Sequence, residues 1–326
     1  MNTEVMERGR RFSIRQLLID YGLYFVFAAL LLFFALMNPR FLTIRNGITI
    51  LQMSSTLGIV VVGMFFILIT GGIDISVASN MYFSAIVGAL LLNNYHIPIW
   101  LCFVVSTLSG MVIGAINGLF VAKFKIVPFI VTLATMSIAR GLGLLLSNTR
   151  LIVLDPAAFV VSNTRILGVP LVAYIFLATV LLGHFILSKT RYGRQLYACG
   201  NNLVGAEKVG LKTVRIVFLA YVFCGAMAGL AGMVNATQLS MINQNFAIGD
   251  EFVVISSAVV GGASLFGGKG KVLPGALIGV TMIQVILNGL TLVQASPYLY
   301  NIIRGIIIFI AVMIDCIKYS GDHDLK

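Results

Sequence analysis

Long apolar runs alternate with short polar passages along the whole chain of 326 residues. A helix needs roughly 20 mostly apolar residues to cross the hydrocarbon of a bilayer, and the strict apolar and polar alternation typical of strands is absent. The pattern therefore predicts transmembrane α-helices rather than a closed β-barrel. The candidate spans are ten: 17–37, 48–69, 76–93, 98–122, 128–147, 168–187, 214–235, 252–266, 272–292 and 298–317.

The longest polar passage between two of these runs is KTRYGRQLYACGNNLVGAEKVGLK, from Lys189 to Lys212. It holds five of the 22 Lys and Arg residues against one acid, Glu207. In so apolar a chain, such a passage either faces water or binds a partner.

Composition supports an integral membrane protein. Hydrophobic residues make up 59% of the chain and charged residues 10%, whereas roughly a quarter of the residues of a soluble domain are charged. The four cysteines occur singly, without CxxC spacing, and the three histidines are scattered, so neither a metal site nor a disulfide framework is expected. No grouping of Ser, His and acid suggests hydrolysis.

The positive charge is arranged in the way that sets membrane orientation. With the N-terminus inside, the cytoplasmic segments carry sixteen Lys and Arg residues and the outside loops carry four, in agreement with the positive-inside rule. The net charge of +11 thus reflects topology rather than nucleic-acid binding. We expect a cytoplasmic leader (1–16), a transmembrane domain (17–317) with a cytoplasmic loop at 188–213, and a cytoplasmic tail (318–326).

Residues 68–79, LITGGIDISVAS, predict a break between two spans. Gly71 and Gly72 are poor helix formers, and Asp74 would be costly in hydrocarbon unless it is buried in protein or faces water. The segment is either a tight turn in which Asp74 caps the next helix or a hinge of a translocation path. We favour a hinge with capping.

Residues 114–142 place polar side chains inside apolar spans. Asn117 lies between Gly114 and Gly118, a small-residue face on which an amide can bond across a helix interface; pore lining is the second possibility. Pro128 is expected to begin a helix. Arg140 lies well inside its span, so it either pairs internally or faces the pathway.

Residues 259–276, VVGGASLFGGKGKVLPGA, are rich in glycine but do not form a nucleotide site. The P-loop pattern GxxxxGK[ST] is absent, because Lys269 and Lys271 are followed by neither Ser nor Thr. The stretch is better explained as a bend at which two half-helices meet near the cytoplasmic surface.

These segments together resemble a family, the permease subunits of bacterial ABC importers for monosaccharides and related small molecules. ITGGIDISVAS resembles the signature GGIDLSVGS, and INGLFVAKFKIVPFIVTLATMSIARG resembles NGxLVxxxxIPxFIxTLGTMxIxRG. KTRYGRQLYACGNN is similar to RTxFGRxxYAxGGN, and VVGGASLFGGKGKV to GGTSLxGGxG. The motifs occur in the family's order over nearly the whole chain. Small departures, such as Asn201 in place of the second Gly of GGN, leave the sugar open.

The resemblance implies an all-α, vitamin-B12-importer-like (type II) permease of about ten helices in the bacterial inner membrane, paired with a second copy. It implies a cytoplasmic ATPase that uses ATP and Mg, a periplasmic sugar-binding protein, and import of D-allose or a ribose-like sugar. The chain itself would hold no metal, cofactor or catalytic residue.

The resemblance also places a helix that couples to the ATPase within 189–212. The residues expected to take part in coupling are Lys189, Arg191, Tyr192, Gly193, Arg194, Tyr197, Ala198, Gly200, Asn201, Ala206 and Gly210. Those expected in the translocation path or its hinges are Gly71, Gly72, Asp74, Asn117, Pro128, Arg140, Gly261, Gly262, Gly267 and Gly268.

Two other classes remain as alternatives. A secondary transporter or channel would work without an ATPase, but ion coupling usually leaves several acids within the spans, and Asp74 is nearly alone there. A membrane-embedded enzyme is the weaker alternative, since no catalytic grouping is evident.

Overall fold

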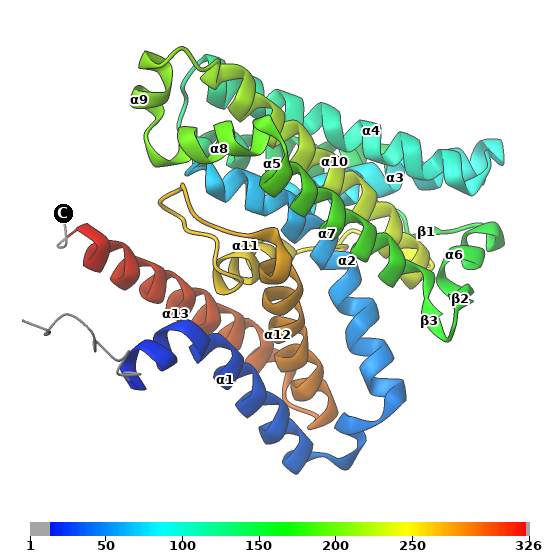
Figure 1. Ribbon diagram of the computed structural model, residues 1–326. Coiled ribbons are helices and arrows are strands. Elements are labelled where there is room, and N and C mark those ends of the chain that lie inside the picture. The colour runs from blue at the N-terminus through cyan, green and yellow to red at the C-terminus, as the bar shows by residue number, and fades with distance from the viewer. Residues whose placement is uncertain (1–13, 324–326) are drawn as a thin grey trace, which may run out of the picture.

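The computed structural model describes residues 14–323, which form a bundle of long α-helices (Figure 1). Most of the predicted leader (1–16) and the last three residues of the predicted tail (318–326) lie outside this range. The helices at the predicted spans are α1 (Ile14–Met37), α2 (Ile44–Ile69), α3 (Val77–Tyr95), α4 (Ile99–Gly118), α5 (Pro128–Ser147), α7 (Leu171–Lys189), α10 (Thr213–Leu239), α11 (Asp250–Val260), α12 (Val272–Leu292) and α13 (Pro297–His323).

Short elements connect these helices. They are the 3-10 turns η1 (Pro39–Leu42) and η3 (Pro156–Ala158), the π-helical turn η2 (Leu119–Lys123), the helices α6 (Phe159–Asn163), α8 (Arg191–Asn201) and α9 (Leu203–Lys208), and the strands β1 (Ile152–Val153), β2 (Arg165–Ile166), β3 (Val169–Pro170) and β4 (Met241–Ile242).

Each predicted span overlaps one of these helices, but α11 is too short to be a span. Among the described residues, six helices are long and apolar enough to cross a membrane: α2, α4 with η2, α5, α7, α10 and α12. The prediction of a full span at 252–266 is wrong, because α11 has 11 residues and is therefore about 16 Å long, half the thickness of the hydrocarbon. It stops at Val260 because the chain turns through Gly261 and Gly262, and Gly262 has a positive φ of 96°.

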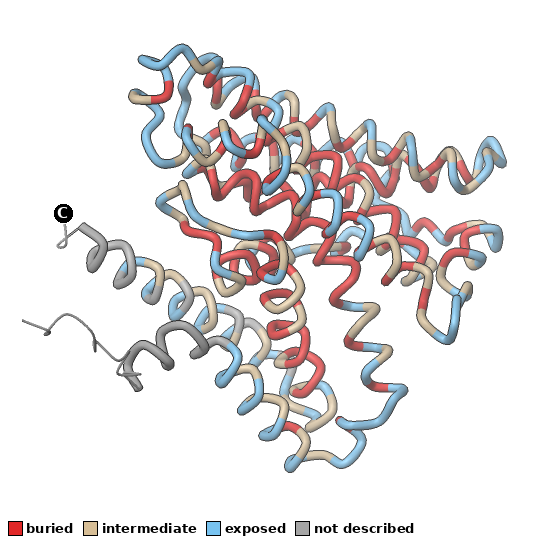
Figure 2. The backbone as a smooth tube through the Cα atoms, in the orientation of Figure 1, coloured by how far each residue is buried: buried red, intermediate tan, exposed pale blue. Residues whose placement is uncertain are grey.

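Helix α2 forms the centre of the bundle and is buried almost continuously from Ser54 to Ile69 (Figure 2). Helix α10 packs against α2, α3 and α4, and α12 packs against α2, α7 and α11. The backbones of α4 and α10 touch, because a Cβ built on Gly114 would overlap the carbonyl oxygen of Tyr221. Small residues at such crossings are typical of helix packing in membranes.

The outer faces of the bundle are apolar. Trp100 on α4 and Leu145 on α5 are 66% and 70% exposed. Soluble monomers rarely expose large contiguous apolar patches, so these faces suit lipid. The fold is that of an all-α, multi-pass membrane protein, as the sequence predicts.

The two ends of the bundle differ. At one end, β1 pairs with β4 in antiparallel register, Ile152 with Ile242, and the side chain of Asn93 on α3 donates to the carbonyl oxygen of Val153. We call this the β1–β4 end. The opposite end, which we call the α8 end, carries α8 and α9 (Figure 1).

Candidate functional site

The predicted break after α2 is a buried turn, residues 70–76, organised by a carboxylate. Asp74 is 2% exposed, and its Oδ1 accepts hydrogen bonds from the backbone N–H of Ser76 (2.8 Å) and from the Ser76 hydroxyl (2.6 Å). Ser76 directly precedes α3, which has no side-chain hydrogen bond at its N-cap. The carboxylate therefore holds the turn that leads into α3, without capping the first N–H groups of that helix.

Asn117 on α4 joins this turn to α5. Its amide nitrogen donates to Asp74 Oδ2 (3.3 Å) and to Ser76 Oγ (2.9 Å), and its Oδ1 accepts from Thr135 Oγ1 (2.6 Å). The amide thus bonds across the interfaces between these helices, the first of the two roles predicted for it. Tyr221 on α10 completes the cluster. Its hydroxyl is buried without a hydrogen-bond partner among the described residues, and a Cβ built on Gly72 would lie 2.6 Å from the hydroxyl oxygen.

Helix α8 has one face toward solvent and one toward the bundle. The cap of α8 is Thr190, whose hydroxyl accepts from the N–H of Gly193. The exposed predicted residues are Lys189, Arg191, Arg194, Ala198, Asn201 and Gly210. The remaining predicted residues are buried or half-buried: Tyr192, Gly193, Tyr197, Gly200 and Ala206.

The inward face of α8 is attached to the helices beneath it. The Tyr192 hydroxyl donates to the carbonyl oxygen of Ile216 at the start of α10 (3.0 Å), and the Tyr197 hydroxyl donates to that of Gly270 in the glycine-rich turn. Burial raises the pKa of the Tyr197 phenol and that of the neighbouring Cys199 thiol. Both groups are therefore uncharged at neutral pH.

Four glycines from three separate sequence motifs meet around the end of α2. The backbone N–H of Gly268 donates to the carbonyl oxygen of Ile69 (2.9 Å), and a Cβ on Gly200 would overlap that same oxygen. A Cβ on Gly267 would lie 2.8 Å from the Gly200 carbonyl oxygen and 3.1 Å from the Gly71 nitrogen. We call Gly71, Gly200, Gly267 and Gly268 the glycine junction. Sequence reasoning named all four but did not bring them together.

The turn between α11 and α12, residues 261–271, is held by α13 on one side. The Asp315 carboxylate on α13 accepts from the N–H of Leu265 (2.8 Å) and from the Ser264 hydroxyl (3.2 Å). Gly261 packs directly on Gly275, as a Cβ on either would overlap the other's carbonyl oxygen. A bend is present here, as predicted, but it joins the half-helix α11 to the full-length helix α12 rather than two half-helices.

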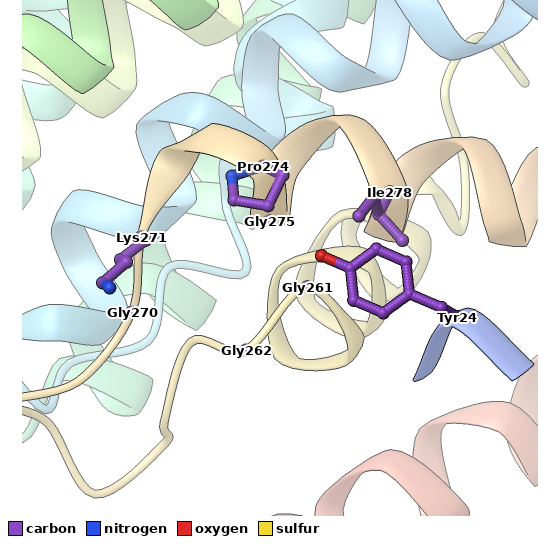
Figure 3. A pocket seen from close by; sticks show the side chains of 8 residues that line it. All are labelled: Tyr24, Gly261, Gly262, Gly270, Lys271, Pro274, Gly275 and Ile278. Atoms are coloured by element: carbon purple, nitrogen blue, oxygen red, sulfur yellow. The ribbon is translucent and has the colours of Figure 1, made fainter. Parts of the chain in front are cut away.

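A cavity of about 310 Å³ separates this turn from α1 (Figure 3). Tyr24 forms one wall, and Lys271 and Pro274 lie on the other. A Cβ on Gly262 would meet nothing within 4 Å. There is consequently space beside the turn for it to move.

Arg140 lies deep in α5, which begins at Pro128. Its Nη1 donates to the carbonyl oxygen of Phe246 (2.9 Å), and its guanidinium lies over the Tyr82 ring, 4.5 Å from the centroid. Of the two possibilities for Arg140, internal pairing or a place facing the pathway, the structure shows an internal partner. That partner belongs to the segment between β4 and α11, residues 243–249, which sequence reasoning did not consider.

The end of the loop 188–213 carries exposed apolar residues that sequence reasoning also missed. Leu203 is 44% exposed, Val204 62% and Val209 77%. Glu207, between them, accepts from the Thr213 hydroxyl (3.0 Å) and pairs with Lys125 (3.8 Å). The signal was available in the sequence LVGAEKVG, whose apolar residues lie in an otherwise polar loop.

Comparison with known proteins identifies the class. Residues 46–312 match the family described as branched-chain amino acid transport system / permease component. The chain is 32% identical to the ribose import permease protein of Haemophilus influenzae, over 96% of this chain and 98% of that protein. The chain belongs to this family of ABC importer permeases. The family resemblance read from the sequence motifs is thereby confirmed.

Further relatives of the permease carry other sugar names. It is 32% identical to the L-arabinose transport system permease protein of Escherichia coli (95% of this chain, 94% of that protein) and 31% identical to the D-allose transport system permease protein of the same organism (90% and 91%). No solved structure matches the chain significantly. The sequence identities to these three relatives are nearly equal, so they do not indicate which sugar this permease transports.

Proposed function

We propose that the chain is the translocating subunit of an ATP-driven importer that moves a monosaccharide, D-allose or a ribose-like sugar, by alternating access. The support for a sugar is the set of relatives named for ribose, L-arabinose and D-allose import, each matched over at least nine-tenths of this chain. ATP and Mg would be used by a separate partner chain.

The observation that carries an ATP-driven mechanism is the glycine junction. Helix α8 presents Arg191 and Arg194 to solvent, while its other face touches both predicted breaks, at Ile69 and at Gly268. A partner that pushes on α8 would therefore act on the end of α2 and on the turn 261–271 together. Rigid movement about such breaks is a common way to switch a transporter.

The α8 end is the proposed docking site of the ATPase. Its exposed basic residues suit an acidic partner surface, and the exposed Val204 and Val209 supply apolar contact area of the kind that protein interfaces bury at their centre. The coupling residues of the loop 188–213 fall into two roles under this proposal. Those on the exposed face of α8 contact the ATPase, and those on the inward face transmit its movement.

The proposed orientation puts both termini and the α8 end in the cytoplasm of a bacterium, and the β1–β4 end in the periplasm, where a sugar-binding protein would dock. A second copy of the permease would complete the path. Cysteines introduced at Val153 and Val209, both exposed, test the orientation. A membrane-impermeant maleimide should label Val153→Cys in intact cells and Val209→Cys only after permeabilisation; the reverse order would overturn it.

Transport in proteoliposomes tests the function. The full chain would be reconstituted with an ABC ATPase and a sugar-binding protein from the same genome, and offered labelled D-ribose, L-arabinose, D-allose and L-leucine. We expect ATP-dependent accumulation of at least one sugar and none of leucine. Accumulation of leucine alone would contradict the sugar assignment. Sugar uptake that needs an ion gradient and no ATP would favour the secondary-transporter alternative.

A further inference from the structure

A second cavity, of about 420 Å³, opens between the end of α10 and the segment 243–249. This volume lies within the range of roughly 300–1,000 Å³ typical of small-ligand sites. Polar side chains line it from three directions: Asn235 from α10, Asn243 and Asn245 from the segment itself, and Asp250 from the start of α11. We call it the amide pocket.

The amide pocket lies next to the β1–β4 end, because Met241 of β4 is one of its lining residues. Phe246 also lines it and accepts a hydrogen bond from Arg140, the thirteenth residue of the 20 in α5. Helix α11 starts from this depth and runs to the α8 end. The segment 243–249 and α11 thus cross the bundle together.

Irregular backbone at membrane depth is tolerated where it is buried in protein or lines a water-filled cavity. The segment 243–249 has an irregular backbone, with Ala247 and Gly249 at φ values of 61° and 85°, and its polar residues 243–245 are exposed beside the cavity. It is built by turns: the Asn243 side chain accepts from the N–H of Asn245 (2.9 Å), and the N–H of Phe246 donates to the Asn243 carbonyl oxygen (3.1 Å). The chain therefore maintains a polar concavity where a regular helix would fill the space.

The chemistry of the lining selects the class of ligand. Each asparagine side chain offers two N–H donors and a carbonyl acceptor, and a carboxylate offers acceptors alone. This mixture matches the hydroxyl groups of a neutral polyol, each of which both donates and accepts. None of the eight lining residues is Lys, Arg or His, and the guanidinium of Arg140 beside them is already bonded to the carbonyl oxygen of Phe246. This lining disfavours the carboxylate of an amino acid or another anion. A lone acidic residue among three amides is too little for a metal cation.

From this arrangement we infer that the amide pocket is a monosaccharide-binding subsite of the permease, reached from the β1–β4 end, in which Asn235, Asn243, Asn245 and Asp250 bind sugar hydroxyls. The inference rests on the proposed function, which supplies the sugar, and adds the place in this chain where the sugar binds and the side chains that contact it. The membrane subunit would then contribute to sugar specificity alongside the sugar-binding protein.

A pair of single-cysteine reporters tests the subsite directly. Met241 lines the pocket, and its cross-strand partner Val153 does not, although both are exposed, at 44% and 60%. Cys316 is the exposed native cysteine among the described residues and would be replaced by serine, while Cys102, Cys199 and Cys224 are buried. The full-length protein in nanodiscs would be labelled with a maleimide in the presence of D-ribose, L-arabinose, D-allose or L-leucine.

We expect at least one of the sugars to slow the labelling of Met241→Cys and to leave that of Val153→Cys unchanged, and leucine to slow neither. Asn245→Ala and Asp250→Asn, each added to the Met241→Cys protein, should raise the sugar concentration for half protection about tenfold, the size expected for one lost hydrogen bond. Gln244→Ala, in the same segment but outside the pocket lining, is the matched control and should leave it unchanged.

The outcomes separate this inference from the proposed function. If the proteoliposomes accumulate a sugar that does not protect Met241→Cys, or if Asn245→Ala and Asp250→Asn leave both protection and the KM for uptake unchanged, the subsite is wrong and the importer stands. If leucine protects and no sugar does, the pocket binds a different class of solute and the sugar assignment falls with it. If none of the four solutes protects, the inference is overturned, whatever the result of the transport assay.

Discussion

The backbone N–H of Gly268 donates a hydrogen bond to the carbonyl oxygen of Ile69, 2.9 Å away across 199 positions of sequence. Ile69 ends α2, so its carbonyl oxygen has no partner within that helix. The glycine-rich turn supplies the partner from outside. Because Gly268 has a φ of 71°, a conformation that glycine adopts without strain, the contact depends on the residue type.

Adding a methyl group at the glycine junction should disturb it. In Gly200→Ala the new Cβ would overlap the Ile69 carbonyl oxygen, so α8 must move away from α2, at a cost of about 1–3 kcal/mol for overpacking. We expect a lower thermal unfolding midpoint and slower uptake. Gly141→Ala is the control, because that helical glycine has nothing within 4 Å and alanine should stabilise the helix by about 0.5–1 kcal/mol. Equal behaviour of the two variants would contradict the role of the junction.

Asp74 is expected to hold the turn 70–76 through its acceptor oxygens. In Asp74→Ala the backbone and hydroxyl donors of Ser76 and the amide of Asn117 lose their acceptor, which should cost roughly 1–3 kcal/mol and reduce the amount of folded protein in the membrane. Asp74→Asn keeps one acceptor oxygen and should be the milder change. Fluorescence-detected size exclusion after graded heating measures both. Normal abundance, melting and uptake of the alanine variant would show the carboxylate to be dispensable.

The positions of the helices could be predicted from sequence because apolar run length is set by the thickness of the bilayer. The predicted span 252–266 failed for a local reason. Its residues are mostly apolar, and apolarity alone does not distinguish a half-helix packed in protein from a full span in lipid. Helix α11 ends where Gly261 packs against Gly275 of α12, a tertiary contact that has no local sequence signal.

The residues of the candidate site could be predicted from the sequence individually, but their contacts with one another could not. Gly71, Gly200 and Gly268 each lie in a recognisable motif, but their meeting at Ile69 is a tertiary contact with no local signal. The amide pocket was missed for a different reason. Asn243 and Asn245 lie in a short polar connection that looks like an ordinary surface loop. What distinguishes it is the hydrogen bond from Arg140, more than one hundred positions earlier, to the carbonyl oxygen of Phe246.

Arg140 should control the order of the segment 243–249. In Arg140→Ala the hydrogen bond to the Phe246 carbonyl oxygen and the stacking on Tyr82 are both lost, contributions of about 1–3 kcal/mol together. The free energy of local opening falls accordingly, so amide hydrogen exchange across 243–250 should become about tenfold faster. Arg150→Ala, which removes an exposed arginine next to β1, is the matched control. Unchanged exchange in the Arg140 variant would show that the segment is held by other contacts.

The exposed arginines of α8 should govern assembly rather than folding. Arg191 and Arg194 lie on the solvent face of a helix whose opposite face carries the packing contacts of Tyr192 and Tyr197. Replacing both arginines by alanine should leave the melting temperature within about 1 °C, since exposed charges contribute little to stability. Affinity for the ATPase should fall about tenfold, the scale of one or two ion pairs at an interface.

Lys212→Ala, exposed in the same loop but beyond α8 and α9, serves as the control, and pull-down of the ATPase with solubilised permease gives the readout. Retained assembly together with normal ATP-dependent uptake in the double variant would show that these arginines do not form the docking surface. The variant that combines Val204→Asp with Val209→Asp would then test whether the apolar residues around α9 form it.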